Sequence, residues 1–266
     1  MLGKPLDLQL SEPDPNPSWI VDDLMERGAC ILFSADSGAG KSFLCMHLAS
    51  CLVRGEPWLG KRTHGSRVMF IDNENHPRIV RKRLRMLGMD GHEPQVRYFN
   101  RLGVQLGAGA WLERTLAEIE DFKPDIIVLD TVSSTTKAIT PPDGGGGMGG
   151  GNEAIAYLYA TVLRPLAGTE RAVILQHHEK KPQAGVKRDA RYSVLGGMQW
   201  FGQADSMFSV ERKGDVFEDG DVRRYPVELT LVKDRDGNSF KMPMAFSSRM
   251  EDGRLRGWIE RWQADD

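Results

Sequence analysis

The chain has 266 residues, 40% of them hydrophobic, and a formal net charge of -2. This length suffices for one sizeable core, so we expect a single domain over residues 19–266 after a tail of residues 1–18. The near-neutral balance excludes a global basic field for nucleic acid, so any such contact must come from a local cluster. No apolar run approaches the roughly 20 residues that span a bilayer, and residues 1–17 lack the plan of a signal peptide. We therefore expect a cytoplasmic protein without a membrane partner.

The first predicted elements alternate between strand and helix. Residues 29–33 are an apolar run that predicts a strand. Residues 42–53 are apolar on almost every side of a helix and are followed by Gly55, which indicates a buried helix with a glycine cap. A strand at residues 67–72 precedes a helix that Pro77 opens. The pattern continues with a helix at 111–122, a β-branched strand at 125–129, a helix at 152–166 and a strand at 172–175. Such alternation predicts an α/β fold with a mostly parallel, twisted sheet flanked by helices.

The C-terminal part has a different pattern. Apolar and polar residues alternate over residues 227–231 and again over 240–246, with Asp236-Gly237 between them. This is a hairpin signal, so we expect the sheet to end in antiparallel strands. Two segments break the pattern: the glycine tract at 144–151, predicted to be a loop, and residues 213–224, predicted to be a surface connection. Cys30, Cys45 and Cys51 have no metal-ligand spacing and are expected to be buried.

Residues 35–42 read Ala-Asp-Ser-Gly-Ala-Gly-Lys-Ser and match the phosphate-loop pattern in all but the first glycine. Gly38 and Gly40 let backbone N–H groups turn toward phosphate oxygens, and the following helix adds a favourable dipole. Lys41 is placed to reach the β and γ phosphates, and Ser42 offers a hydroxyl to Mg²⁺. The pattern predicts ATP and Mg²⁺ as cofactors, held by Ala35, Asp36, Ser37, Gly38, Ala39, Gly40, Lys41, Ser42 and Phe43.

A second anchor for the metal is expected at the end of a later strand. Residues 126–130 read Ile-Ile-Val-Leu-Asp, an apolar strand that delivers a carboxylate at its tip. We therefore expect Asp130 to hold Mg²⁺ together with Ser42. A strand-end aspartate that caps the next turn is the alternative interpretation.

Residues 70–76, Phe-Ile-Asp-Asn-Glu-Asn-His, resemble the stretch of RecA-like ATPases in which a glutamate after the second core strand activates the attacking water. This resemblance implies that Glu74 is the catalytic base. Asp72 is the alternate candidate, and acids that favour a helix N-terminus are the structural alternative.

The likeness extends from Trp19 to about Gly237. It includes Gly55-Glu56-Pro57-Trp58-Leu59-Gly60, the segment Gln176-His177-His178-Glu179-Lys180-Lys181, and Lys233-Asp234-Arg235-Asp236-Gly237. The chain resembles the RepA-type branch of RecA-like ATPases, which includes ring-forming plasmid and phage helicases. It is similar, more distantly, to DnaB-type helicases and to RecA. Ala35 and the tract at 144–151 depart from that pattern.

The resemblance implies further site residues. A residue at the end of the strand after the Asp130 strand senses the γ-phosphate in these families. Gln176, His177 and His178 are candidates, of which we favour His178. Lys233 and Arg235 resemble the motif that reaches the γ-phosphate of a neighbouring subunit, and Arg191 is a second candidate for that role.

A local basic cluster follows the predicted sensor. In the resembling families this loop faces a central channel and binds single-stranded DNA, which here implies phosphate contacts from Lys180, Lys181, Lys187 and Arg188. A solvated basic loop is the alternative. A second basic face, with Arg78, Arg81, Lys82 and Arg85, is interpreted as surface or subunit contact, with nucleotide or DNA contact as the less favoured alternative.

These features together predict an ATP-hydrolysing, DNA-binding motor. The resemblance implies as partners copies of the chain itself in a ring, expected to be a hexamer with ATP sites at subunit interfaces, and single-stranded DNA. The alternatives are a recombinase that forms filaments and a regulatory ATPase switch without translocation.

Overall fold

The computed structural model describes residues 18–65, 67–107, 109–137, 151–179 and 198–262, with the single residues Leu6, Ile139, Arg191 and Val194. The strands are β1 (Trp19–Val21), β2 (Met25–Glu26), β3 (Cys30–Ala35), β4 (Val68–Asp72), β5 (Val96–Asn100), β6 (Ile126–Asp130), β7 (Ala172–His178), β8 (Ser206–Arg212), β9 (Phe217–Asp219), β10 (Val222–Lys233), β11 (Phe240–Glu251) and β12 (Arg254–Arg261). The helices are α2 (Lys41–Arg54), α3 (Pro77–Met86), α4 (Gly109–Phe122), α5 (Val132–Thr135), α6 (Gly151–Leu158), η1 (Tyr159–Leu163), α7 (Arg164–Ala167) and α9 (Met198–Gln203).

One large sheet organises these elements, in the order β12-β11-β10-β8-β3-β7-β6-β4-β5, with β9 beside β10. The six strands β8, β3, β7, β6, β4 and β5 are parallel to one another. β10, β11 and β12 continue the sheet in antiparallel pairing. The predicted α/β architecture, with a mostly parallel sheet that ends in antiparallel strands, is therefore confirmed.

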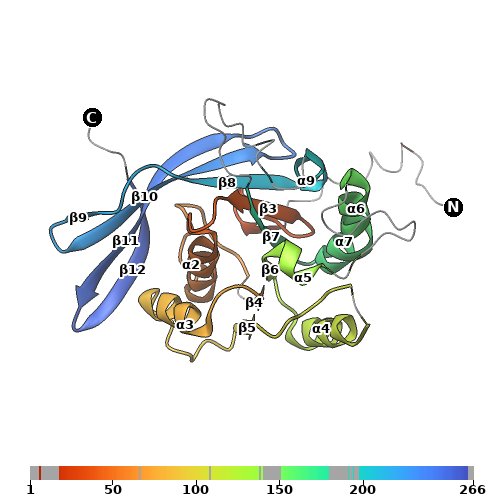
Figure 1. Ribbon diagram of the computed structural model, residues 1–266, viewed down its shortest axis with the longest axis horizontal. Coiled ribbons are helices and arrows are strands. Elements are labelled where there is room, and N and C mark those ends of the chain that lie inside the picture. The colour runs from red at the N-terminus through yellow and green to blue at the C-terminus, as the bar shows by residue number, and fades with distance from the viewer. Residues whose placement is uncertain are drawn as a thin grey trace.

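Helices cover both faces of the parallel strands, and alternate residues of β3 show why. Ile31 and Phe33 pack into the core that α2 and α3 close, whereas Cys30 and Leu32 pack into the core that α4, η1 and α7 close. Figure 1 shows these two groups of helices on opposite sides of the strands. A strand apolar at every position is what burial on both faces requires.

Several elements differ from the sequence-based expectation. Residues 213–224 were expected to be a connection, but β9 and the start of β10 lie there as a hairpin with mostly exposed side chains. β5, β8 and β12 were not predicted. The residues of β5 are all only partly buried, so this edge strand lacks a clear apolar period. The helix predicted at 152–166 contains the π-helical turn η1, which no propensity rule anticipates.

The described helices include none with the length and apolar character that crossing a membrane requires. The three cysteines are buried and unpaired, as expected. The antiparallel strands β10–β12 curve out from the core past α2 and α3 (Figure 1). β12 packs against α3 at Gly257, where an added Cβ would lie 3.1 Å from Cε of Met86. This close approach holds the C-terminal strands beside α3.

Candidate functional site

Four parallel strands end at one edge of the sheet and bring the predicted site residues together. Asp72, Asp130 and Gln176 occupy the same level of β4, β6 and β7, and Ala35 of β3 pairs with His178 of β7. In open parallel sheets, ligands bind outside the carboxyl ends of the strands. The register alone therefore gathers residues that are widely separated in sequence.

The phosphate loop leaves β3 at Ala35 and enters α2 at Lys41. Gly38 and Gly40 have φ values of 80° and 98°, a conformation that glycine adopts without steric cost. Lys41 is 6% exposed, and its ammonium donates to the carbonyl oxygens of Ala35 and Asp36 at 3.0 and 3.3 Å. Burial lowers the pKa of Lys41, opposed by nearby carboxylates of which Asp130 acts most strongly. The ammonium therefore lies inside the loop that would hold phosphate.

Ser42 and Asp130 form an oxygen pair beside this loop. The Ser42 hydroxyl donates to Oδ2 of Asp130 at 2.6 Å. Burial raises the pKa of Asp130 to about 6, and the neighbouring Asp72 carboxylate acts in the same direction. Hard oxygen donors and concentrated negative charge fit Mg²⁺, which keeps several waters and takes phosphate oxygens as additional ligands. These two residues are the ones that would hold it.

Asn75 links the two halves of this oxygen cluster, and sequence reasoning did not single it out. Its amide nitrogen donates to Oδ2 of Asp130 at 2.8 Å, to Oδ2 of Asp72 at 3.1 Å and lies 3.3 Å from the Ser42 hydroxyl. Arg83 of α3 donates to its amide oxygen at 3.2 Å. The signal in the sequence was an amide two residues before the proline that opens α3.

Asp72 is fully buried, and its carboxylate accepts several hydrogen bonds. It accepts from the backbone N–H groups of Glu74 and Asn75 at 2.9 and 2.8 Å and from the Tyr98 hydroxyl at 2.7 Å. A carboxylate held in this way shapes the turn that carries Glu74. Its contacts favour a positioning role over the alternate base role considered from sequence.

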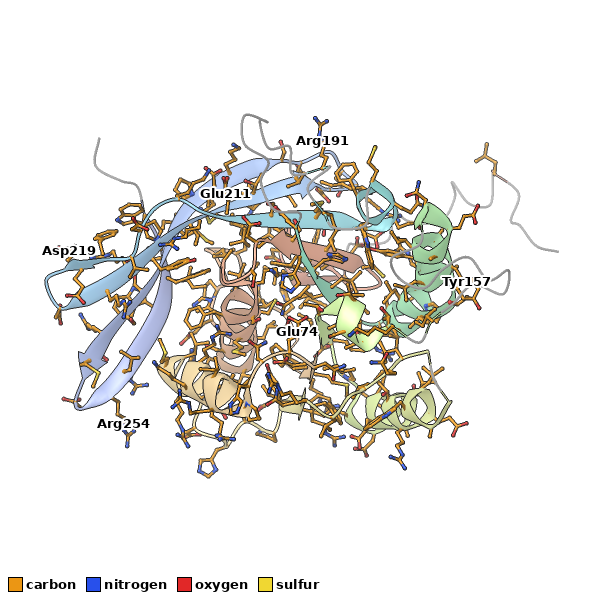
Figure 2. All side chains as sticks on the ribbon, viewed as in Figure 1. Glu74, Tyr157, Arg191, Glu211, Asp219 and Arg254 are labelled. Carbon is orange, nitrogen blue, oxygen red and sulfur yellow. The ribbon has the colours of Figure 1, made fainter. Side chains whose placement is uncertain are left out.

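Glu74 lies between two side chains from different strand ends. The Thr131 hydroxyl donates to its Oε1 at 2.8 Å, and Nε2 of His178 lies 3.3 Å from its Oε2. The hydrogen bond from His178 is the main cause that lowers the pKa of Glu74, with burial acting in the opposite direction. Figure 2 shows Glu74 near the centre of the molecule, close to α5. Thr131, which sequence reasoning missed, directly follows the Asp130 strand.

The three candidate sensors at the end of β7 occupy different surroundings. Gln176 Oε1 is 3.4 Å from the Ser42 hydroxyl. His177 points to the other face of the sheet, 4% exposed and 4.8 Å from the Trp200 ring, and burial lowers its pKa to about 4. Among the described residues, the buried Nδ1 of His178 has no hydrogen-bond partner. Only His178 contacts Glu74, which favours it within the set.

The cations considered for a neighbouring site lie away from the phosphate loop. Lys233 pairs with Met207 near the amino end of β8, and its ammonium donates to the carbonyls of Phe201, Gly202 and Ala204. Arg235 forms an ion pair with Asp205 and remains 66% exposed. Both lie at the opposite end of the parallel strands from Ala35, and β3 alone spans roughly 17 Å. Arg191 is exposed.

Aromatic residues of the C-terminal strands form a wall over the phosphate loop. The Tyr225 hydroxyl donates to the Gly38 carbonyl at 3.1 Å, and Phe246 stacks on Tyr225 with ring centroids 6.1 Å apart. A Cβ on Gly40 would overlap the ring of Phe246, so only glycine fits there. A cavity of about 340 Å³ opens between this wall, the loop and α3. An aromatic pair beside a phosphate loop can hold a nucleobase.

Part of the predicted site lies outside the described residues. This applies to Lys180, Lys181, Lys187 and Arg188 and to most of the tract at 144–151, of which Gly151 begins α6. The strand that leads into this basic segment ends at His178, next to Glu74.

Comparison with known proteins gives one family. The family model described as an AAA domain matches residues 4–184, a stretch that includes the phosphate loop, Glu74, Asp130 and His178. None of the curated proteins compared with the chain matches it.

Proposed function

The chain belongs to the AAA domain family, and on this premise we propose that it is the subunit of a ring-shaped motor that hydrolyses ATP while moving along single-stranded DNA. The family accounts for nucleotide binding and ATP hydrolysis. The ring, the DNA and the place of the chain in the RepA-type branch of RecA-like ATPases are our proposal.

The hydrolysis step is an in-line attack of water on the γ-phosphate. We assign Glu74 as the group that orients this water and accepts its proton, because it is a half-exposed carboxylate at the open edge of the sheet, held by Thr131 and His178. Lys41 would contact the β and γ phosphates. Mg²⁺ held by Ser42 and Asp130 would supply positive charge against the phosphates.

The Glu74–His178 contact carries the proposal. His178 ends β7, and Lys180 and Lys181 follow two and three residues later in the sequence, so a change in its contact with Glu74 would be passed along the chain to the basic segment. A motor requires such a link between the water-activating residue and the DNA contact. A plain nucleotide-binding switch needs no basic segment at this place.

The position of the remaining cations supports the proposed assembly into a ring. Lys233 and Arg235 lie at the amino end of the strands, away from the phosphate loop of their own subunit, which supports a role at a neighbouring site. Lys233 is held by carbonyl oxygens of α9 and the residue after it, whereas Arg235 is largely exposed. We therefore assign Arg235 as the group that reaches across the interface, with Lys233 fixing the turn that carries it.

We also assign the aromatic wall of Tyr225 and Phe246 to the nucleobase. A base stacked on this wall would keep its triphosphate within reach of the loop, because Tyr225 is bonded to Gly38.

The test is phosphate release with and without a single-stranded oligonucleotide, with the native mass measured in parallel. We expect DNA to raise the rate and the mass to correspond to a closed ring. Lys41→Ala should abolish nucleotide binding or hydrolysis. Joint replacement of Lys180, Lys181, Lys187 and Arg188 by alanine should remove the stimulation and leave the basal rate. A rate indifferent to DNA would favour the regulatory switch, and extended filaments on DNA would favour the recombinase.

A further inference from the structure

A basic groove runs between α3 and the start of β12, with a volume of about 780 Å³. Its walls come from segments more than a hundred residues apart, so no sequence pattern joined them. The six cationic side chains that line it are Arg78, Arg81, Lys82, Arg85, Arg254 and Arg256. Figure 2 shows Arg254 near the tip of the β11–β12 hairpin, beside α3.

The charge of the groove is almost uncompensated. All six cations are exposed, and the lining includes a single carboxylate, Asp90. Within the described part of the chain, the one ion pair made by these six joins Arg256 to Glu251 at 3.9 Å. The six positive charges repel one another, although the whole chain has a net charge of -2. A bound anion would relieve this repulsion, so such a cluster is expected at an anion-binding site.

Packing fixes the two walls relative to each other. Gly257 of β12 lies against Met86, and the Arg54 guanidinium donates to the Leu87 carbonyl at the end of α3. Arg78, Arg81 and Arg85 recur about one turn of α3 apart, ~5.4 Å, so they form a row along the groove. A rigid row of cations suits an extended, regularly charged ligand.

The lining favours a nucleic-acid backbone over an acidic protein segment. It contains no aromatic side chain, and its apolar members Met86, Met89 and Leu255 are all buried or partly buried. Protein interfaces depend on aromatic or aliphatic anchors in pockets, which this groove lacks. Arginine guanidinium groups match phosphate geometry, and without aromatics for stacking the contact would be insensitive to sequence.

We propose that this groove binds the phosphate backbone of a nucleic-acid strand, as a second contact separate from the segment at residues 180–188. The groove also borders the nucleotide cavity, since Lys82 and Met86 line both. Arg83, on the same helix, donates a hydrogen bond to Asn75, and Asn75 in turn donates one to Asp130. A nucleic-acid strand bound in the groove would therefore contact α3, the helix that supports the residues expected to bind the metal.

The experiment measures fluorescence anisotropy of a labelled single-stranded oligodeoxynucleotide over a range of salt, with and without ATP. The groove variant is Arg81→Glu with Arg85→Glu, and Arg254→Glu tests the opposite wall. The matched control is Arg62→Glu with Lys123→Glu, two exposed cations outside the groove that give the same change in net charge as the double variant of α3; Arg62→Glu alone is the control for Arg254→Glu. We expect at least a tenfold weaker affinity for both groove variants and wild-type affinity for the control. The salt slope should become shallower by ~0.7 for each phosphate that the variant no longer neutralises.

The joint alanine variant of Lys180, Lys181, Lys187 and Arg188 separates this proposal from the proposed function. Loss of binding in that variant alone, with wild-type binding by both groove variants, overturns the groove proposal and leaves the motor intact. Loss in the groove variants alone supports the groove and removes the loop from the motor. Polyglutamate that binds the wild type more strongly than DNA, and no longer binds the groove variants, would assign the groove to an acidic protein and overturn the proposal.

Discussion

Oε2 of Glu74 lies 3.3 Å from Nε2 of His178, where Glu74 follows the end of β4 and His178 ends β7. A carboxylate can only accept, so this nitrogen carries the proton. The pair joins the proposed water-activating group to the strand that precedes the basic segment.

Glu74→Gln should retain ATP binding and slow turnover by ~10²-fold or more, because the amide cannot accept the proton of water. Phosphate release and binding of a fluorescent ATP analogue are measured together. The control is Glu113→Gln, an exposed position of α4. Turnover near the wild-type rate would remove Glu74 from the base assignment.

His178→Ala should shift the acid limb of the pH–rate profile to higher pH. The hydrogen bond from His178 lowers the pKa of Glu74, so Glu74 stays ionised at lower pH in the wild type. Without that bond the pKa of Glu74 rises and activity is lost earlier on acidification. His92→Ala, at an exposed position away from Glu74, should leave the profile unchanged. An unshifted acid limb for His178→Ala would contradict the proposed coupling.

Phe246→Ala should weaken ATP binding roughly tenfold, the loss expected for one aromatic stacking contact with a base. Tyr225→Phe tests the bond to Gly38 separately and should have a smaller effect. The control is Phe217→Ala, an aromatic of β9 that packs on Trp262. Competition by GTP and CTP shows whether the wall contributes to base choice, and equal ATP affinity in all variants would exclude it.

Arg235→Ala and Lys41→Ala subunits should each be inactive as pure rings and partly active when mixed. An ATP site is complete when a subunit with an intact phosphate loop is followed in the ring by a subunit with an intact Arg235. With equal amounts mixed at random, about a quarter of the sites meet this condition. Mixing Lys41→Ala with Glu74→Gln should restore nothing, because both defects lie in the same half of the site. No recovery in the first mixture would place Arg235 outside the shared site.

Acidification from pH 7 to 5 should destabilise the fold. Burial lowers the pKa of both His47 and His177 to about 4, below the ordinary value of 6.5. At these two histidines the unfolded chain binds more protons in this window, so each lowers stability by roughly 2 kcal/mol at pH 5. Asp130, whose pKa is raised to about 6, binds more protons in the folded state and offsets part of this loss. Urea unfolding measures this, and His47→Gln should flatten the dependence. A stability independent of pH over this range would contradict the burial argument.

The parallel core and the phosphate loop could be predicted because their signals are local. A continuous apolar run ending in Gly38-Ala39-Gly40-Lys41-Ser42 fixes both strand and helix. The same holds for the strand that ends at Asp130. Asn75 and Thr131 could not be singled out, because their importance arises only when the strand ends meet.

The C-terminal strands show the second limit. The hairpin of residues 227–246 was predicted from alternation and is confirmed, but its curvature is a tertiary property. That curvature places Phe246 over Gly40 and Arg254 beside α3. An alternating pattern predicts which residues share one face of a strand, but it does not predict which other elements that face packs against.

The position of Phe246 over Gly40 has a consequence for relatives of this protein. The family match ends at residue 184, whereas the aromatic wall comes from residues 225 and 246. If the wall sets the preferred base, then relatives that share the phosphate loop differ in nucleotide selectivity because their residues after the matched region differ. Two proteins with identical phosphate loops could then consume different nucleoside triphosphates, and a comparison restricted to the matched region would not distinguish them.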